Sequence, residues 1–102
     1  MTSLNDSILN NVSGGIGRGK EARLVVTIDL TKYHFEETIT IKPYLDGVLC
    51  KSLVKTIDPL SEFVTLNFSG YGVKRLKVKL NNLISRYYIL DFDQNLVTEE
   101  NF

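Results

Sequence analysis

The chain has 102 residues, 43% of them hydrophobic, and its twelve basic residues balance twelve acidic ones. A chain of this length is expected to form one domain with a modest core. The balanced charge gives no global field that would favour nucleic acid or an anionic membrane. No apolar run approaches the roughly 18 residues that a membrane-spanning helix needs. Cys50 is the only cysteine, so no disulfide can form within the chain.

The first twenty residues, MTSLNDSILNNVSGGIGRGK, carry a helical pattern. Residues 3–6 are suited to capping a helix N-terminus. An apolar stripe of about 140° follows on a helix at roughly 100° per residue, formed by Leu4, Ile8, Leu9 and Val12. Gly14 is placed to end the helix in the left-handed conformation. Isolated helices shorter than ~12–15 residues are marginal in water, so this segment is expected to fold only when its stripe docks on a surface.

The same segment resembles a double-glycine leader peptide, the export signal of class II bacteriocins and related peptides. In that family two glycines end the leader, and apolar residues lie four, seven and twelve places before the cleaved bond. Those places hold Val12, Leu9 and Leu4 here, and the glycines are Gly14 and Gly15. The resemblance implies that a peptidase-containing ABC transporter binds the stripe as a helix and cuts after the second glycine.

Two positions depart from the family's pattern, since Ile8 stands where the family often has Glu and Asn5 where it often has Ser. The alternative is an N-terminal helix followed by a glycine linker, with no cleavage. The leader interpretation divides the chain into a leader at 1–15, a glycine-rich linker at 16–21 and a folded domain at 22–102.

From Ala22 onward, apolar residues alternate with polar ones, which is typical of strands with one buried face. Strands are expected in residues 22–30, 37–45, 48–57, 63–68, 73–80 and 86–92. Asp46 and Gly47, between two of these runs, predict a tight hairpin. No helical period separates the strands, which favours an all-β fold. We expect a small antiparallel β-sandwich of immunoglobulin-like general shape, with a small barrel as the alternative.

No catalytic or cofactor site emerges from the residues. The glycine-rich run at 14–19 lacks the preceding strand and following helix of a phosphate-binding loop. His34 is the only histidine and cannot build a His-rich metal site. Cys50 lies on a predicted strand and is expected to be a small buried hydrophobe rather than a nucleophile activated by His34. We therefore expect a protein that is not an enzyme and that carries no cofactor or metal.

The acidic residues near the C-terminus have part of a calcium-loop pattern. The EF-hand needs Gly and Glu where this chain has Leu96 and Phe102, which excludes that motif. A solvated acidic tail is expected instead, with a weak surface Ca²⁺ site as the alternative. The carboxylates concerned are Asp91, Asp93, Glu99 and Glu100.

Two sets of side chains are candidates for contact with other molecules. Arg75, Lys77 and Lys79 alternate onto one face of their strand, but sheets that bind nucleic acid interleave aromatic residues, and this run has none. The basic strip is therefore expected to be a solvated face that protects an edge strand. A possible ligand surface for sugars or peptides is expected from three tyrosines on outward or turn positions, Tyr44, Tyr71 and Tyr87.

Two functions fit these features. The first is a small secreted β-sandwich, exported by a peptidase-containing ABC transporter, that acts as a bacteriocin-like or signalling effector on a protein or glycan target. The second is a cytoplasmic or structural module that binds or assembles with a protein or carbohydrate partner, with the N-terminal segment as a tail.

Overall fold

The computed structural model describes residues 21–101, and it is built almost wholly of strands. In chain order the elements are β2 (Ala22–Asp29), β3 (Ile39–Leu45), β4 (Val48–Leu49), the 3-10 helix η1 (Lys51–Leu53), β5 (Lys55–Ile57), β6 (Phe63–Gly70), β7 (Val73–Leu80), β8 (Ile84–Asp91) and β9 (Leu96–Glu100). The all-β prediction is confirmed. The predicted N-terminal helix and the double glycine lie outside the described residues.

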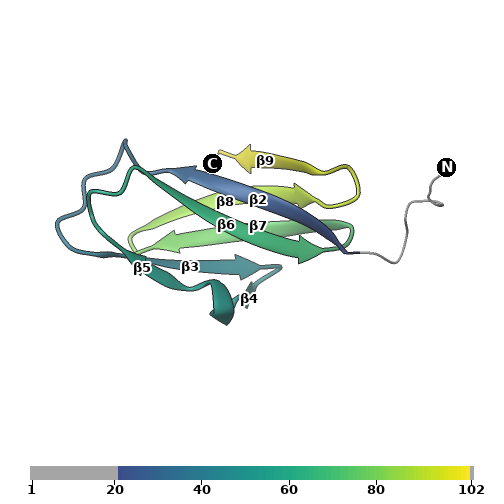
Figure 1. Cartoon of the computed structure of the whole chain (residues 1–102), viewed down its shortest axis with the longest axis horizontal. Coiled ribbons are helices and arrows are strands. Elements are labelled where there is room, and N and C mark those ends of the chain that lie inside the picture. The colour runs from purple at the N-terminus through teal and green to yellow at the C-terminus, as the bar shows by residue number, and fades with distance from the viewer. Residues whose placement is uncertain (1–20, 102) are drawn as a thin grey trace.

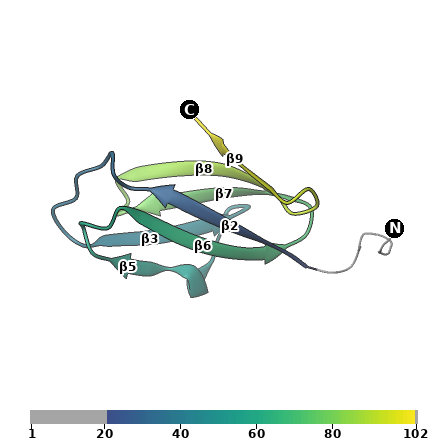
Figure 2. The ribbon, with the colours of Figure 1, turned by 45° about the horizontal axis from the view of Figure 1, so that its top comes forward.

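The strands form two antiparallel sheets that pack face to face (Figure 1). The small sheet consists of β2 and β6, and the large sheet has the order β4-β3-β7-β8-β9, with β5 also pairing with β3. Figure 2 shows the small sheet lying across the large one as a separate layer. The immunoglobulin-like part of the prediction stays a prediction, because a constant-type domain divides its seven strands four and three.

The core lies between the two sheets and follows the predicted alternation. Its buried side chains are Leu24, Val26, Ile28, Leu30, Ile39, Ile41, Val64, Leu66, Phe68, Leu76, Val78, Leu80, Tyr88, Leu90 and Phe92. All of them come from the phase that the period of two assigns to the inside. Full burial of an aliphatic or aromatic side chain of this size stabilises the fold by about 1.5–3 kcal/mol.

Tight turns join the strands where the residues tolerate a positive φ. Asp46 (φ 49°) and Gly47 (φ 84°) form the two-residue turn of the β3–β4 hairpin, which confirms the prediction. Gly72 (φ 66°) lies where the chain passes from β6 in the small sheet to β7 in the large sheet. None of the helical structure in residues 21–101 is long and apolar enough to cross a membrane.

The prediction of a solvated acidic tail was wrong. Residues 96–100 form β9, which pairs with β8 from Asp91 opposite Leu96 to Tyr87 opposite Glu100. In the loop before β9, Asp91 Oδ1 accepts a hydrogen bond from the Gln94 N–H at 3.0 Å. Asp93 Oδ1 likewise accepts from the Gly72 N–H at 3.2 Å. Both aspartates therefore stabilise turns by accepting backbone hydrogen bonds, which accounts for their spacing.

The prediction that the basic strip protects an edge was also wrong. β7, which carries the strip, is the central strand of the large sheet, with β3 on one side and β8 on the other. The predicted strand at 48–57 is in fact two short strands, β4 and β5, separated by η1. Alternation indicates which side of a strand is buried, but it carries no information on which strands are neighbours.

Candidate functional site

The strongest candidate site is the outward surface of the large sheet, which the register of β3, β7 and β8 assembles. We call this surface the cationic face, and its side chains are Lys42, Tyr44, Arg75, Lys77, Lys79 and Tyr87. Tyr44 is the cross-strand partner of Lys77, and Lys77 is the partner of Tyr87. One lysine on the central strand therefore lies between two tyrosines on the neighbouring strands.

Each of these tyrosines holds a lysine against its ring. The Lys77 Nζ lies over the Tyr87 ring, 5.8 Å from the centroid, and the Lys79 Nζ lies over the Tyr44 ring at 5.5 Å. Both distances are within the range of a cation–π contact. The contacts restrict the lysine side chains, so less conformational entropy is lost when a ligand binds their ammonium groups.

The three lysines of the cationic face form no ion pair with a carboxylate of the described residues, although Lys42 also lines the larger hollow that Glu36 and Glu37 line. Within residues 21–101, ion pairs form only at Lys74–Asp46, Arg75–Glu100 and Arg86–Glu99. Lys42 lies directly opposite Lys79, and like charges in such cross-strand positions are destabilising. This side of the sheet therefore has a concentrated positive charge that costs the fold some stability.

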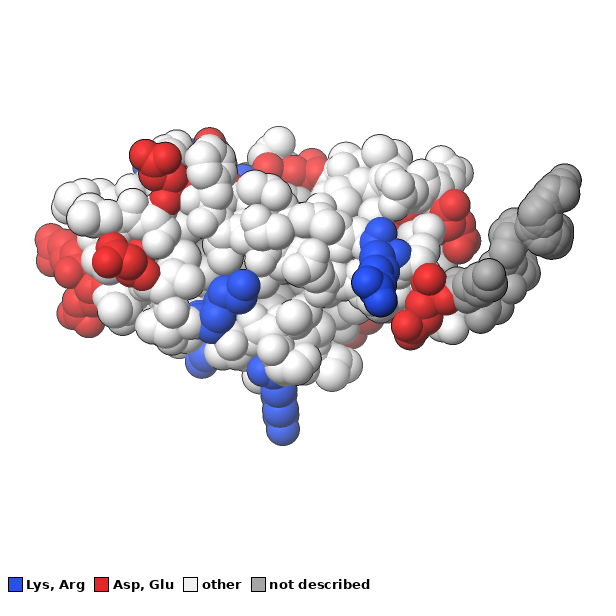
Figure 3. Space-filling model, viewed as in Figure 1, with Lys and Arg blue, Asp and Glu red and all other residues white. Residues whose placement is uncertain are grey.

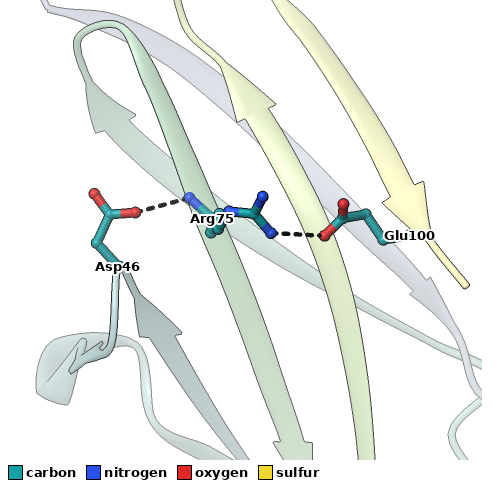
Figure 4. Close-up of polar contacts among 3 residues, drawn as sticks. All are labelled: Asp46, Arg75 and Glu100. Carbon is teal, nitrogen blue, oxygen red and sulfur yellow. Dashed lines mark hydrogen bonds and ion pairs between the residues drawn. The ribbon is translucent and has the colours of Figure 1, made fainter. Parts of the chain in front are cut away.

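Arg75 lies at the border of the cationic face, and its charge is balanced. Its backbone N–H donates to Asp46 Oδ1 at 2.9 Å, and its Nη1 donates to Glu100 Oε1 at 3.4 Å (Figure 4). The guanidinium reaches from β7 past β8 to the end of β9. Because the Arg75 side chain is 73% exposed, the pair with Glu100 contributes little to stability.

An open hollow of about 470 Å³ lies on the cationic face, lined by Tyr44, Gly47, Arg75, Leu76, Lys77, Lys79, Tyr87 and Glu100. A larger hollow of about 640 Å³ lies at the opposite end of β3, beside His34 and Asn81. There Asn81 Oδ1 accepts from the Thr40 N–H at 2.7 Å, and Nδ2 donates to the Thr38 carbonyl at 3.1 Å. Because these bonds occupy the Asn81 amide in joining the turn after β7 to the start of β3, we consider the smaller hollow the better candidate site.

The outward surface of the small sheet has a different chemistry. The exposed side chains along the middle of β2 and β6 are Val25, Thr27, Thr65 and Asn67. Figure 3 views this side, where a few separate basic side chains lie across the middle and acidic groups gather mainly towards the two ends. The contrast makes the small-sheet surface a natural control for the cationic face.

The structure brings together two of the three predicted tyrosines. Tyr44 and Tyr87 share the cationic face, whereas Tyr71, 52% exposed, lies in the turn after β6 and does not line the hollow. The observation that the basic strip has no aromatic residues holds for β7 alone, because β3 and β8 supply them. Sequence reasoning also missed Lys42 as a site residue, although its outward position was readable from the alternation.

The remaining candidates gain no support. Burial raises the pKa of the half-buried Cys50 thiol, so it is a weaker nucleophile at neutral pH. The Cys50 N–H bonds to Pro43 near the end of β3, whereas His34 is exposed and precedes its start. No group of side chains in residues 21–101 has the composition of a metal site. The leader residues Leu4, Leu9, Val12, Gly14 and Gly15 lie outside the described residues.

A second polar cluster lies on the inner side of β8, near the edge of the sandwich. Arg86 Nε donates to Glu99 Oε2 at 2.6 Å, and its Nη1 donates to the Tyr33 hydroxyl at 2.9 Å. Burial opposes the charge of Arg86, but these bonds hold its pKa above the ordinary value. The cluster joins β9 and the loop before β3 to β8, so we assign it a structural role.

Tyr88 lies beside this cluster with its side chain buried. Its hydroxyl has no hydrogen-bond partner among the described residues. Burial raises the pKa of Tyr88 to about 12. Burial therefore disfavours the ionised form of this phenol in the folded chain.

Comparisons of the chain with protein-family models, with curated proteins and with solved structures find no match. The geometry of the cationic face and the pattern of residues 1–15 are therefore the observations on which a function can be proposed.

Proposed function

We propose that this chain is a small non-enzymatic binding protein, made as a precursor and exported, that recognises its target with the cationic face. The observation that carries the binding part is the row in which Lys77 lies between Tyr44 and Tyr87. The export part depends on the resemblance of residues 1–15 to a double-glycine leader. Outside the cell, the protein would act as a bacteriocin-like or signalling effector.

Three features favour binding over simple solvation of the cationic face. It is centred on β7 and thus is not an edge that charge must protect from aggregation. Its lysines include a directly opposed like-charge pair, Lys42 and Lys79, which stability alone disfavours. It also presents half-buried tyrosine rings, which are enriched where proteins contact other molecules.

The export part predicts a defined cleavage. When the chain is expressed with a peptidase-containing ABC transporter, intact mass spectrometry of the medium should find a species that begins at Ile16. Gly14→Leu and Leu9→Asp should abolish this species, because a narrow cleft before the protease nucleophile admits only glycine and the stripe must dock as a helix. Ser7→Ala, off the stripe, is the matched control and should be exported normally.

Export before folding is physically reasonable for this domain. A sandwich dominated by pairings between distant residues folds in about milliseconds to seconds, which leaves time for transport of a loosely folded chain. A native protein that retains residue 1, with no species beginning at Ile16 in the medium, would contradict the leader proposal and favour the second function, an intracellular or structural binding module.

The binding part is tested with an array of glycans and peptides, probed with the labelled chain. We expect the unmodified chain to give binding signals on the array. The double variant Lys77→Gln/Tyr87→Ala should lose them. Thr27→Ala/Thr65→Ala, on the small-sheet surface, changes as many side chains and should retain them. Signals that survive in the first variant would show that the cationic face is not the binding site.

A further inference from the structure

We infer that the ligand of the cationic face is an acidic polysaccharide, a glycan that carries carboxylate or sulfate groups. The inference rests on the proposed binding function and names its ligand.

The first argument is the spacing of the positive charges. Lys42 and Lys79 are cross-strand partners, so their Cβ atoms are about 5 Å apart. Lys77 is two residues along β7 from Lys79, which corresponds to roughly 7 Å. Three ammonium groups at this spacing complement several anionic groups repeated along one chain better than they complement a single small anion.

The second argument is the use of the tyrosine rings. Proteins that bind single-stranded nucleic acid stack bases on open aromatic faces. Here the Lys79 and Lys77 ammonium groups lie over the Tyr44 and Tyr87 rings, so one face of each ring is occupied. A base that stacked on the same face of either ring would have to displace the ammonium group. A sugar chain makes no such demand, because its hydroxyl and C–H groups can contact ring edges and hydroxyls.

The third argument is the border of the face. Glu100 lies beside Tyr87 in the same row, and Asp46 follows β3 at the end where Arg75 lies. A nucleic acid carries a phosphate on every nucleotide and would meet these carboxylates as it leaves the lysines. A glycan in which neutral sugars alternate with acidic ones can place hydroxyl groups there, and hydroxyl groups donate hydrogen bonds to carboxylates.

An extended peptide is disfavoured by topology. Peptides that add to a sheet pair with the backbone of an exposed edge strand. The cationic face is centred on β7, whose two edges are already paired with β3 and β8. Its recognition must therefore come from side chains alone, as glycan binding does on a flat sheet.

The test measures binding of the full chain to matched polymers by isothermal titration calorimetry. Hyaluronate and keratan sulfate, in which neutral sugars alternate with carboxylated or sulfated ones, supply the two kinds of acidic group, and dextran is the neutral control. We expect both acidic polymers to bind about tenfold or more tightly than dextran, with affinity that falls as salt is raised. An oligothymidylate and polyglutamate test the nucleic-acid and peptide alternatives, and both should bind more weakly than the acidic glycans.

Two variants separate the face from overall charge. Lys77→Gln/Lys79→Gln should weaken binding of the acidic glycans by about tenfold or more. Lys32→Gln/Lys51→Gln removes the same charge from exposed positions off the face and should weaken it by less than about threefold. Circular dichroism checks that both variants fold.

The inference is overturned if neither acidic glycan binds, if dextran binds equally well, or if the two lysine variants lose affinity equally. Tighter binding of the oligothymidylate or of polyglutamate would also overturn it, in favour of that ligand. These failures differ from failure of the binding function itself. If array signals depend on Lys77 and Tyr87 but come from neutral glycans or peptides, the binding function stands and only the ligand class is wrong.

Discussion

The inner and outer faces of the large sheet each hold an arginine paired with a glutamate of β9. On the inner face, the Arg86 side chain is 11% exposed, and its Nε lies 2.6 Å from Glu99 Oε2. On the outer face, the Arg75 side chain is 73% exposed, and its Nη1 lies 3.4 Å from Glu100 Oε1. The two glutamates are consecutive in the chain and similarly exposed (35% and 30%), so the phase of the strand decides which arginine each one pairs with, and the environments that differ are those of the arginines.

The tyrosines of β8 show the same division. Tyr88 points inward and is 4% exposed, whereas Tyr87 points outward beside Lys77. The difference teaches that one strand can bury a side chain in the core on one side and present its chain neighbour at the surface on the other. Buried polar groups in a low-dielectric interior are costly unless they are paired, whereas exposed ones remain available to a ligand at little cost to the fold.

The largest expected effect on stability is the difference between removing Arg86 and removing Arg75. Arg86→Met should lower the free energy of unfolding by about 2–3 kcal/mol, below the full cost of breaking a buried pair because Glu99 is partly exposed. Arg75→Met should lower it by less than about 0.5 kcal/mol. Chemical denaturation measures both values. Equal losses would show that burial does not distinguish the two pairs.

The next effect is a dependence of stability on alkaline pH. Tyr88 has a pKa of about 12 in the folded chain, against about 10 when unfolded. The folded pKa is the higher one, so the contribution of the neutral phenol is complete below about pH 10 and is lost as the pH rises through about 12. The loss should be on the order of 2 kcal/mol.

Denaturation at a series of pH values tests this window. Tyr88→Phe should remove the alkaline loss, because it has no proton to release. Tyr87→Phe, the control on the outer face, should retain it. A Tyr88→Phe protein that loses stability over the same window as the parent would assign the effect to another group.

Much of the fold could be predicted because alternation is a local property. The inward positions from Leu24 to Phe92 that the period of two identified are buried, except Leu45, which is partly buried at the end of β3. The Asp46-Gly47 hairpin was equally readable, since the residue types determine the turn. β9 was missed because its sequence, LVTEE, alternates poorly and ends in two glutamates. Its inward glutamate, Glu99, lies at the rim of the sandwich, where its side chain is 35% exposed and pairs with Arg86 of β8.

The candidate site was readable only in pieces. The outward phases of Tyr44, Lys77 and Tyr87 followed from alternation, but their adjacency depends on the strand order β3-β7-β8. β3 pairs with β7 although β4, β5 and β6 lie between them in the chain. Such a pairing is set by how the two sheets bury their shared core, and no local pattern encodes it.

A smaller effect is expected from the unpaired hydroxyl of Tyr88 at neutral pH. Leaving a buried hydroxyl without a partner costs about 1–3 kcal/mol, part of which is recovered when the group is removed. Tyr88→Phe should therefore raise the free energy of unfolding by roughly 1 kcal/mol, measured by denaturation. A loss of stability instead would show that the hydroxyl has a stabilising partner, such as a buried water molecule.

The smallest effect tests whether the cationic face is kept for binding. Lys79→Thr removes the like-charge pair with Lys42 and introduces a residue that favours strands. It should stabilise the fold by about 0.3–0.5 kcal/mol while weakening the binding of acidic glycans. The reverse change on the small sheet, Thr65→Lys, should neither stabilise the fold nor strengthen the binding of acidic glycans.

A loss of stability in Lys79→Thr would mean that the contact between Lys79 and the Tyr44 ring contributes more to the fold than the repulsion costs. The lysine would then be explained by stability, and its position would no longer favour a binding role. A gain in stability with a loss of binding is what a surface selected for recognition should show, because its charges are retained against the preference of the fold.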